Sequence, residues 1–146
     1  MTKLLVITHG KMAMGIKDSV DLIIGNSDNI ITESLVAGQD FEEFKSSIES
    51  KIRRGGKEEP VLVMVDLFSA SPYNASLYLS QKLREEGYKI EVITGVNLPM
   101  VLEASLMADS MELEELKDLA VKNGREGVID AIALLDSSLE DEEEDY

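Results

Sequence analysis

The chain has no cysteine and a single histidine, His9, among its 146 residues. Without cysteine it forms neither disulfides nor thiolate metal sites, and one imidazole is too few for a transition-metal centre. No apolar run reaches the roughly 18 residues that cross a bilayer. The N-terminus enters a short apolar strand without the longer apolar region of a secretory signal. We therefore expect a cytoplasmic protein without a metal, a cofactor or a membrane span.

Basic residues are also scarce. The sequence holds 14 Lys and Arg against 29 Asp and Glu, for a formal net charge of −15 at pH 7. Nucleic acids bind through basic patches, so this balance argues against a nucleic-acid ligand, whereas it suits a basic protein partner. Residues 140–146 are almost all acidic. We expect residues 136–146 to form an acidic, disordered, solubilising tail.

What the sequence does contain is an alternation of short apolar runs and helical patterns. With 44% hydrophobic residues, the chain is long enough for one domain around one core. The predicted strands are residues 3–7, 30–36, 61–66 and 88–94. The predicted helices are residues 12–24, 40–53, 72–86, 99–109, 111–122 and 128–135. Strands that alternate with helices predict parallel βαβ units and an α/β fold.

Three short segments that follow predicted strands meet at one edge of such a sheet, where open α/β folds bind ligands. They are THG (8–10), DLFSAS (66–71) and GVNLP (95–99). A carboxylate that closes an apolar strand is costly to bury without a partner, and His9 is a natural partner for Asp66. A hydrogen bond to Asp66 would fix the ring tautomer and leave the other nitrogen as a nucleophile.

The helix after Asp66 adds a second element to this edge. Ser71 precedes Pro72, which predicts Ser71 as the N-cap and Pro72 as the first helical residue. The unpaired N–H groups of a helix N-terminus suit a phosphoryl dianion. Each residue alone also fits a structural role, His9 as a gap filler and Asp66 as a cap. The combination of His9 with Asp66 favours chemistry.

Four segments of the chain resemble the IIA component of the mannose family of the bacterial sugar phosphotransferase system (PTS). The segments are VITHG (6–10), VMVDLFSASPYNA (63–75), ITGVNLPM (93–100) and NGREG (123–127). Their order and spacing match over residues 1–135, which we take as one domain ahead of the tail. The resemblance implies a doubly wound, mainly parallel sheet with helices on both faces, and a homodimer.

The resemblance also implies an activity. Members of the family are phosphotransferases, in which the histidine of the first motif accepts a phosphoryl group from the phosphocarrier protein HPr. It passes the group to a IIB component, which phosphorylates a sugar as the membrane components IIC and IID import it. On this chain His9 would accept through Nε2, Asp66 would orient and stabilise the ring, and Ser71 with neighbouring N–H groups would bind the phosphoryl oxygens. A separate IIB protein is expected, and the candidate docking residues are Met12, Met14, Phe68, Leu98, Pro99 and Met100.

The chain departs from the family pattern in the loop after Asp66, where Ser69 and Ala70 stand in place of two common glycines. The side chains of these two residues restrict the backbone of the loop. The resemblance therefore does not predict the rate of transfer or the choice of partner. Two alternative functions stay open: the phosphotransfer subunit of a dihydroxyacetone kinase system, and a non-catalytic regulatory module. A receiver-type signalling domain, with Asp66 as its phosphoacceptor, is rejected. Such a domain needs a pair of acidic residues at the end of its first strand to bind Mg²⁺, and Thr8 and His9 stand there in this chain.

Overall fold

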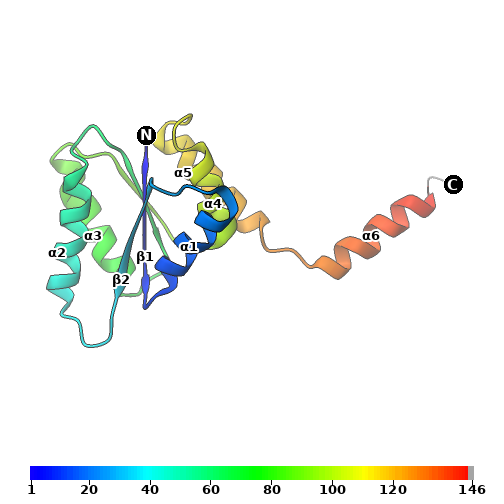
Figure 1. Cartoon of the computed structure of the whole chain (residues 1–146), viewed down its shortest axis with the longest axis horizontal. Coiled ribbons are helices and arrows are strands. Elements are labelled where there is room, and N and C mark those ends of the chain that lie inside the picture. The colour runs from blue at the N-terminus through cyan, green and yellow to red at the C-terminus, as the bar shows by residue number, and fades with distance from the viewer. Residues whose placement is uncertain (145–146) are drawn as a thin grey trace.

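Four parallel strands form the centre of the described chain, in the order β2-β1-β3-β4 (Figure 1). This computed structural model describes residues 1–144. The strands are β1 (Lys3–His9), β2 (Ile30–Leu35), β3 (Val61–Val65) and β4 (Ile90–Ile93). Because every pairing is parallel, all the strand carboxyl ends lie at one edge. β2, the next strand in the sequence, pairs with one side of β1, and β3 pairs with its other side. The strand order therefore reverses at β1.

Helices cover both faces of this sheet. Within residues 1–144 they are α1 (Met12–Ile24), α2 (Phe41–Arg54), α3 (Ser71–Glu85), α4 (Leu98–Met107), α5 (Leu113–Glu126) and α6 (Ala131–Glu144). α2 and α3 lie on one face, and α1, α4 and α5 lie on the other (Figure 1). The α/β prediction with helices on both faces is therefore confirmed. No helix in the described range is long and apolar enough to cross a membrane.

β3 and the middle of β1, residues 4–7, are apolar because both of their faces are buried. Leu4 and Val6 of β1 belong to the core on the side of α1, α4 and α5, whereas Leu5 and Ile7 belong to the core beneath α2 and α3. This alternation follows from the two-residue period of a strand. All five residues of β3 are buried, as predicted for a central strand covered on both sides.

The C-terminal arm differs from the prediction. α6 begins at Ala131 rather than residue 128, and it continues to Glu144 through residues that we expected to be disordered. Asp130 explains the start, because its Oδ1 accepts the Ala133 N–H at 3.0 Å as an N-cap does. α6 runs away from the body and buries none of its residues (Figure 1). The predicted domain boundary at residue 135 falls inside this helix, and residues 145–146 of the predicted tail lie outside the described residues.

Candidate functional site

His9 and Asp66 meet at the carboxyl edge of the sheet. His9 is the last residue of β1, and Asp66 directly follows β3, the neighbouring parallel strand. The Nδ1 atom of His9 lies 2.8 Å from Asp66 Oδ2, and the same oxygen accepts the backbone N–H of His9 at 2.9 Å. The pairing expected from the sequence is therefore present, and the carboxylate holds both the ring and the main chain of His9.

The two side chains differ in exposure, which sets their electrostatics. The Asp66 side chain is 12% exposed and that of His9 is 48% exposed. Burial raises the pKa of the Asp66 carboxyl, but the hydrogen bonds and charge of His9 outweigh it, so the pKa lies below its usual value. Asp66 is therefore ionised at neutral pH and accepts the Nδ1–H. In the neutral ring the free lone pair is then on Nε2.

The main chain around His9 is held by hydrogen bonds of Thr8 and Gly10 that the sequence did not predict. Thr8 is fully buried, and its Oγ1 accepts the Ala13 N–H at 2.8 Å, so a strand residue caps the start of α1. Gly10 has φ of +57°, and its N–H donates to the Leu35 carbonyl at 2.9 Å. These bonds fix the turn between β1 and α1. A threonine ahead of a helix is a capping signal, but the N–H that it caps here is five positions further along the chain.

The start of α3 lies one residue earlier than predicted. Ala70 is the N-cap, with an extended backbone (φ −92°, ψ 175°), and its carbonyl accepts the Asn74 N–H at 2.9 Å. Ser71 is therefore the first helical residue, and no side chain of the described residues caps the helix. Within residues 1–144, no hydrogen bond joins the Ser71 side chain to His9 or Asp66. The Ser71 hydroxyl thus caps no helix, and Ser71 lies at the same edge of the sheet as His9 and Asp66.

Ser69 adopts a backbone conformation that favours glycine. Its φ is +65°, and no other non-glycine residue in the described range has a positive φ. The missing Cβ lets glycine enter this left-handed region freely, whereas other residues lose about 1–2 kcal/mol there. The departure from the family pattern at Ser69 therefore places strain in the loop that joins Asp66 to α3.

Most of the predicted docking residues are accessible. The exposed fractions of Met12, Met14 and Phe68 are 46%, 47% and 66%. Pro99 is exposed, and Leu98 is half-buried. Leu67, which was not among the predicted docking residues, is 60% exposed and precedes Phe68 in the chain. Its place in the segment between Asp66 and Ser71 was the signal that could have found it.

Met100 is a correction to the predicted docking set. It is only 4% exposed and belongs to the core that includes α4 and α5. A Cβ added at Gly124 of α5 would lie 2.7 Å from Met100 Cε, and one at Gly127 would lie 2.7 Å from Pro99 Cγ. The glycines of the NGREG segment therefore let α5 approach the start of α4, and this close approach buries Met100.

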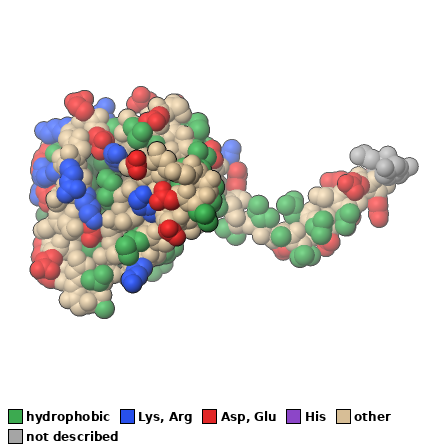
Figure 2. All heavy atoms as spheres, viewed as in Figure 1, with side chains coloured by type: hydrophobic (Ala, Val, Ile, Leu, Met, Phe, Trp, Pro, Cys, Tyr) green, Lys and Arg blue, Asp and Glu red, His purple; other side chains and the backbone are tan. Residues whose placement is uncertain are grey.

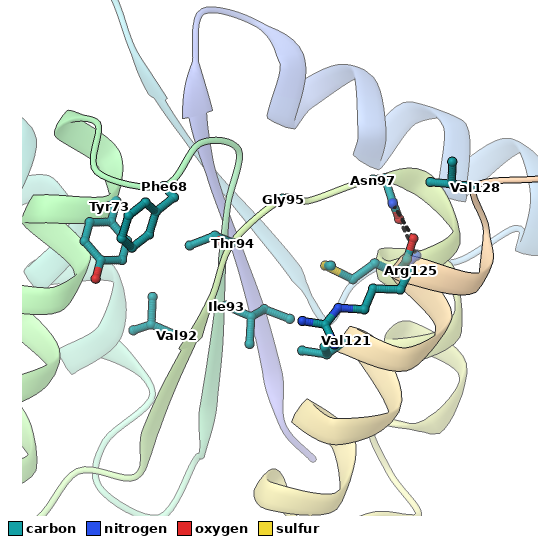
Figure 3. A pocket seen from close by; sticks show the side chains of 12 residues that line it. Phe68, Tyr73, Val92, Ile93, Thr94, Gly95, Asn97, Val121, Arg125 and Val128 are labelled. Carbon is teal, nitrogen blue, oxygen red and sulfur yellow. Dashed lines mark hydrogen bonds between the residues drawn. The ribbon is translucent and has the colours of Figure 1, made fainter.

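A hollow of about 610 Å³ lies at the carboxyl end of β4. Figure 3 shows Phe68 and Tyr73 on one side of it and Val121 and Arg125 on the other. The Phe68 and Tyr73 ring centroids are 5.0 Å apart. Neither His9 nor Asp66 lines this hollow, so it is not the place of the chemistry.

The described residues do not bring together a set of side chains that could bind a metal ion. Residues 1–144 contain no group of three or more His, Cys, Asp or Glu side chains placed to hold a metal ion. What the arrangement offers instead is one imidazole with a fixed tautomer, next to the N-terminus of a helix without acidic residues in its first turn. Such a site suits nucleophilic attack on an electrophile that carries negative charge.

Comparisons with known proteins show the family of the chain. The family model of the PTS system fructose IIA component matches residues 3–121. The mannose-specific EIIAB component of Escherichia coli (strain K12) is 35% identical over 131 residues, which cover 88% of this chain and 39% of that protein. This chain thus spans well under half the length of that relative. The sorbose-specific EIIA component of Lacticaseibacillus casei is 30% identical over 114 residues, which cover 78% of this chain and 79% of the relative.

A solved structure extends the match to three dimensions. The phosphotransferase system component EIIA from Streptococcus agalactiae superposes with a TM-score of 0.83 at 28% identity. The superposition covers 91% of this chain and 99% of that one. Family match, sequence relatives and fold therefore agree over nearly the whole body. The chain is a member of the mannose-type EIIA family, the PTS system fructose IIA components, which belong to sugar phosphotransferase systems.

Proposed function

We propose that the chain is a phosphoryl carrier, which accepts a phosphoryl group from phosphorylated HPr on His9 and passes it to a IIB component. The observation that carries this proposal is the 2.8 Å contact between His9 Nδ1 and Asp66 Oδ2, which leaves Nε2 as the nucleophile. The role places the chain in the cytoplasm, where HPr is charged from phosphoenolpyruvate. The membrane components IIC and IID act downstream, on the sugar.

In the accepting step, the Nε2 lone pair of His9 attacks the phosphorus of the donor phosphohistidine. The new N–P bond forms as the donor N–P bond breaks, and the donor nitrogen regains its electron pair. The phosphorylated ring of His9 keeps its Nδ1–H and gains positive character, so its hydrogen bond to the Asp66 carboxylate becomes charge-assisted. Passing the group to IIB runs the same step in reverse at Nε2.

The phosphoryl oxygens are assigned to the start of α3. The first N–H groups of a helix have no intrahelical acceptor and sit at the positive end of its dipole. The first turn of α3 has no acidic residue, and Ser71 there adds a hydroxyl donor. Pro72 lacks an N–H, so the available backbone donors of this turn are those of Ser71 and Tyr73.

The rim around His9 is assigned to the docking of HPr and IIB. Met12 and Met14 of α1 and Phe68 of the loop before α3 expose apolar surface, with Leu67 beside them. Pro99 and Leu98 extend this rim at the start of α4. Methionine side chains adapt to different partners, which suits a surface that has to accept two of them.

A homodimer is part of the same proposal. The outer side of β4 has no pairing strand within residues 1–144. Figure 2 shows hydrophobic side chains along the arm that carries α6. Ile132, Leu135 and Leu139 recur on one side of this helix with exposed fractions of 68%, 54% and 50%. Exposed apolar surface of this kind favours burial against another chain, and a second copy is the partner that the family resemblance implies.

The oligomeric state is measurable by sedimentation velocity. The full chain is expected to sediment as a dimer, and Leu135→Glu is expected to shift it toward the monomer because it places a charge on the apolar side of α6. Ser137→Glu adds the same charge on the opposite side and serves as the matched control. A full chain that stays monomeric at micromolar concentration contradicts the dimer.

Phosphoryl transfer itself is tested in vitro. The full chain is incubated with phosphoenolpyruvate, enzyme I and HPr, and its intact mass is measured for an acid-labile, base-stable gain of about 80 Da. We expect the adduct on His9, its absence in His9→Ala, and its loss when IIB is added. A wild-type chain that gains no adduct, or an adduct that survives in His9→Ala, contradicts the proposal. An adduct that IIB leaves untouched contradicts the assigned acceptor.

A further inference from the structure

Phosphorylation of His9 concentrates negative charge at this edge of the sheet. A phosphoryl group on an imidazole carries nearly two negative charges, and the Asp66 carboxylate is in contact with the same ring. The chain as a whole is acidic, with a formal net charge of −15. A cation close to His9 would therefore lower the free energy of the phosphorylated state relative to the free one.

Among the segments that follow the strands within residues 1–144, one basic residue lies at this edge, whereas Arg125 of α5 lines the separate hollow at the end of β4. The segments that follow the four strands are residues 10–11, 36–40, 66–70 and 94–97, and the first turns of the next helices are 12–15, 41–44, 71–74 and 98–101. Within all of these described segments, Lys11 is the single lysine or arginine. It comes two positions after His9 in the chain.

The Lys11 side chain is free to move, whereas its backbone is anchored. The residue is exposed at the N-cap of α1, and its side chain has no hydrogen bond or ion pair within residues 1–144. In contrast, Lys17 of the same helix lies 3.4 Å from Asp21 and donates to Ser27 Oγ at 2.6 Å. The Lys11 carbonyl accepts the Gly15 N–H at 3.0 Å, and the bonds of Thr8 and Gly10 close the turn on both sides.

We propose that Lys11 contacts the phosphoryl group on His9 and stabilises the phosphorylated chain; this inference rests on the proposed function. A lysine ammonium offers three donors and a compact charge, which suit a phosphoryl oxygen. Turning toward His9 breaks no existing pair of Lys11. The first turns of α1 and α3 contain no acidic residue that would compete for its ammonium group.

A residue that contacts the phosphoryl group and a residue that only steers a partner affect different measured quantities. HPr and the chain dissociate after transfer, so a residue that only helps docking changes the forward and reverse rates equally. The equilibrium constant for phosphoryl exchange then stays the same. A residue that contacts the phosphoryl group shifts that equilibrium constant, because it stabilises one of the two free carriers.

The experiment measures this equilibrium constant between HPr and the full chain, from the phosphorylated fraction of each protein in intact mass spectra. We expect Lys11→Gln to shift it toward phospho-HPr by about fivefold at low salt, as for a lost exposed ion pair. The shift is expected to shrink in about 0.5 M salt, where charges are screened. Lys11→Arg keeps the charge and is expected to stay within about twofold of wild type.

Lys89→Gln is the matched control. Lys89 is exposed, has no ion pair within the described residues, and directly precedes β4 at the opposite edge of the sheet. It removes the same charge as Lys11→Gln and is expected to leave the equilibrium constant unchanged. Equal equilibrium constants for Lys11→Gln and wild type overturn the inference, as does an equal shift in Lys89→Gln. A wild-type chain that takes no phosphoryl group overturns the proposed function as well, so the two failures are distinguishable.

Discussion

Replacing Ser69 with glycine is expected to raise the stability of the chain, although glycine usually lowers it. The reason is the φ of +65° at Ser69, in the loop between Asp66 and α3. A non-glycine residue in this left-handed region loses about 1–2 kcal/mol through crowding of its Cβ. Ser69 is exposed, so removing its hydroxymethyl group forfeits little packing.

The size of the gain follows from two opposing effects. Relief of the left-handed strain is offset by the greater freedom of glycine in the unfolded chain, which amounts to about 0.4–1 kcal/mol. The net effect is a gain of about 0.5–1 kcal/mol in the free energy of unfolding. For a chain of this length that corresponds to a rise in Tm of about 2–4 °C.

Ala70→Gly provides the control with the opposite sign. Ala70 is the neighbouring residue, but its φ of −92° and ψ of 175° suit any residue. Glycine there relieves no strain and only adds freedom to the unfolded chain, so a loss of about 0.5–1 kcal/mol is expected. Urea denaturation of the wild type and both variants measures the two changes. Shifts of the same sign in Ser69→Gly and Ala70→Gly would refute the strain argument.

Further predictions concern the pair and the packing of α5. The pKa of Asp66 is lowered in the folded chain, so its carboxylate adds stability above the unfolded pKa of about 4, and this stability is lost as pH falls through the folded value. Asp66→Asn should therefore be less stable than wild type at pH 7, with a gap in Tm that closes below about pH 4; a constant gap would contradict the assignment. The same variant should slow phosphorylation of His9 by about 10- to 100-fold, measured by quenched flow. Gly127→Ala drives a Cβ into the Pro99 ring and should destabilise the chain by about 1–3 kcal/mol. Gly15→Ala, in α1 with open space around it, should stabilise it by up to about 1 kcal/mol, and thermal denaturation distinguishes the two signs.

The sheet and the His9–Asp66 pair were predictable because local patterns determine them. Continuous apolar runs identify strands buried on both faces, and alternation with helices makes the strands parallel. Once β1 and β3 are parallel neighbours, their last residues meet at one edge. Asp66 has one imidazole to pair with in the whole chain, so the contact followed from the topology.

The features that the sequence did not predict depend on contacts between distant residues. Met100 has the character of a rim residue, but it packs in the core, where Gly124 lets α5 approach it closely. Thr8 caps a helix across a turn whose shape depends on the bond between Gly10 and Leu35. Residues 128–135 were predicted to be helical, but residues 136–146 were assigned to disorder on their charge, and local sequence does not decide how far a helix continues into such a segment.

The position of His9 at the end of a central strand has a kinetic consequence for the proposed carrier. Its Nδ1 and its backbone N–H both bind the same oxygen of Asp66, which holds the ring against the sheet. The acceptor nitrogen therefore does not move between one position for HPr and another for IIB. HPr and IIB must therefore occupy the same place in turn, and each excludes the other while it is bound. Such a carrier obeys ping-pong kinetics, in which an excess of unphosphorylated HPr or of IIB inhibits the flow of phosphoryl groups by occupying the chain.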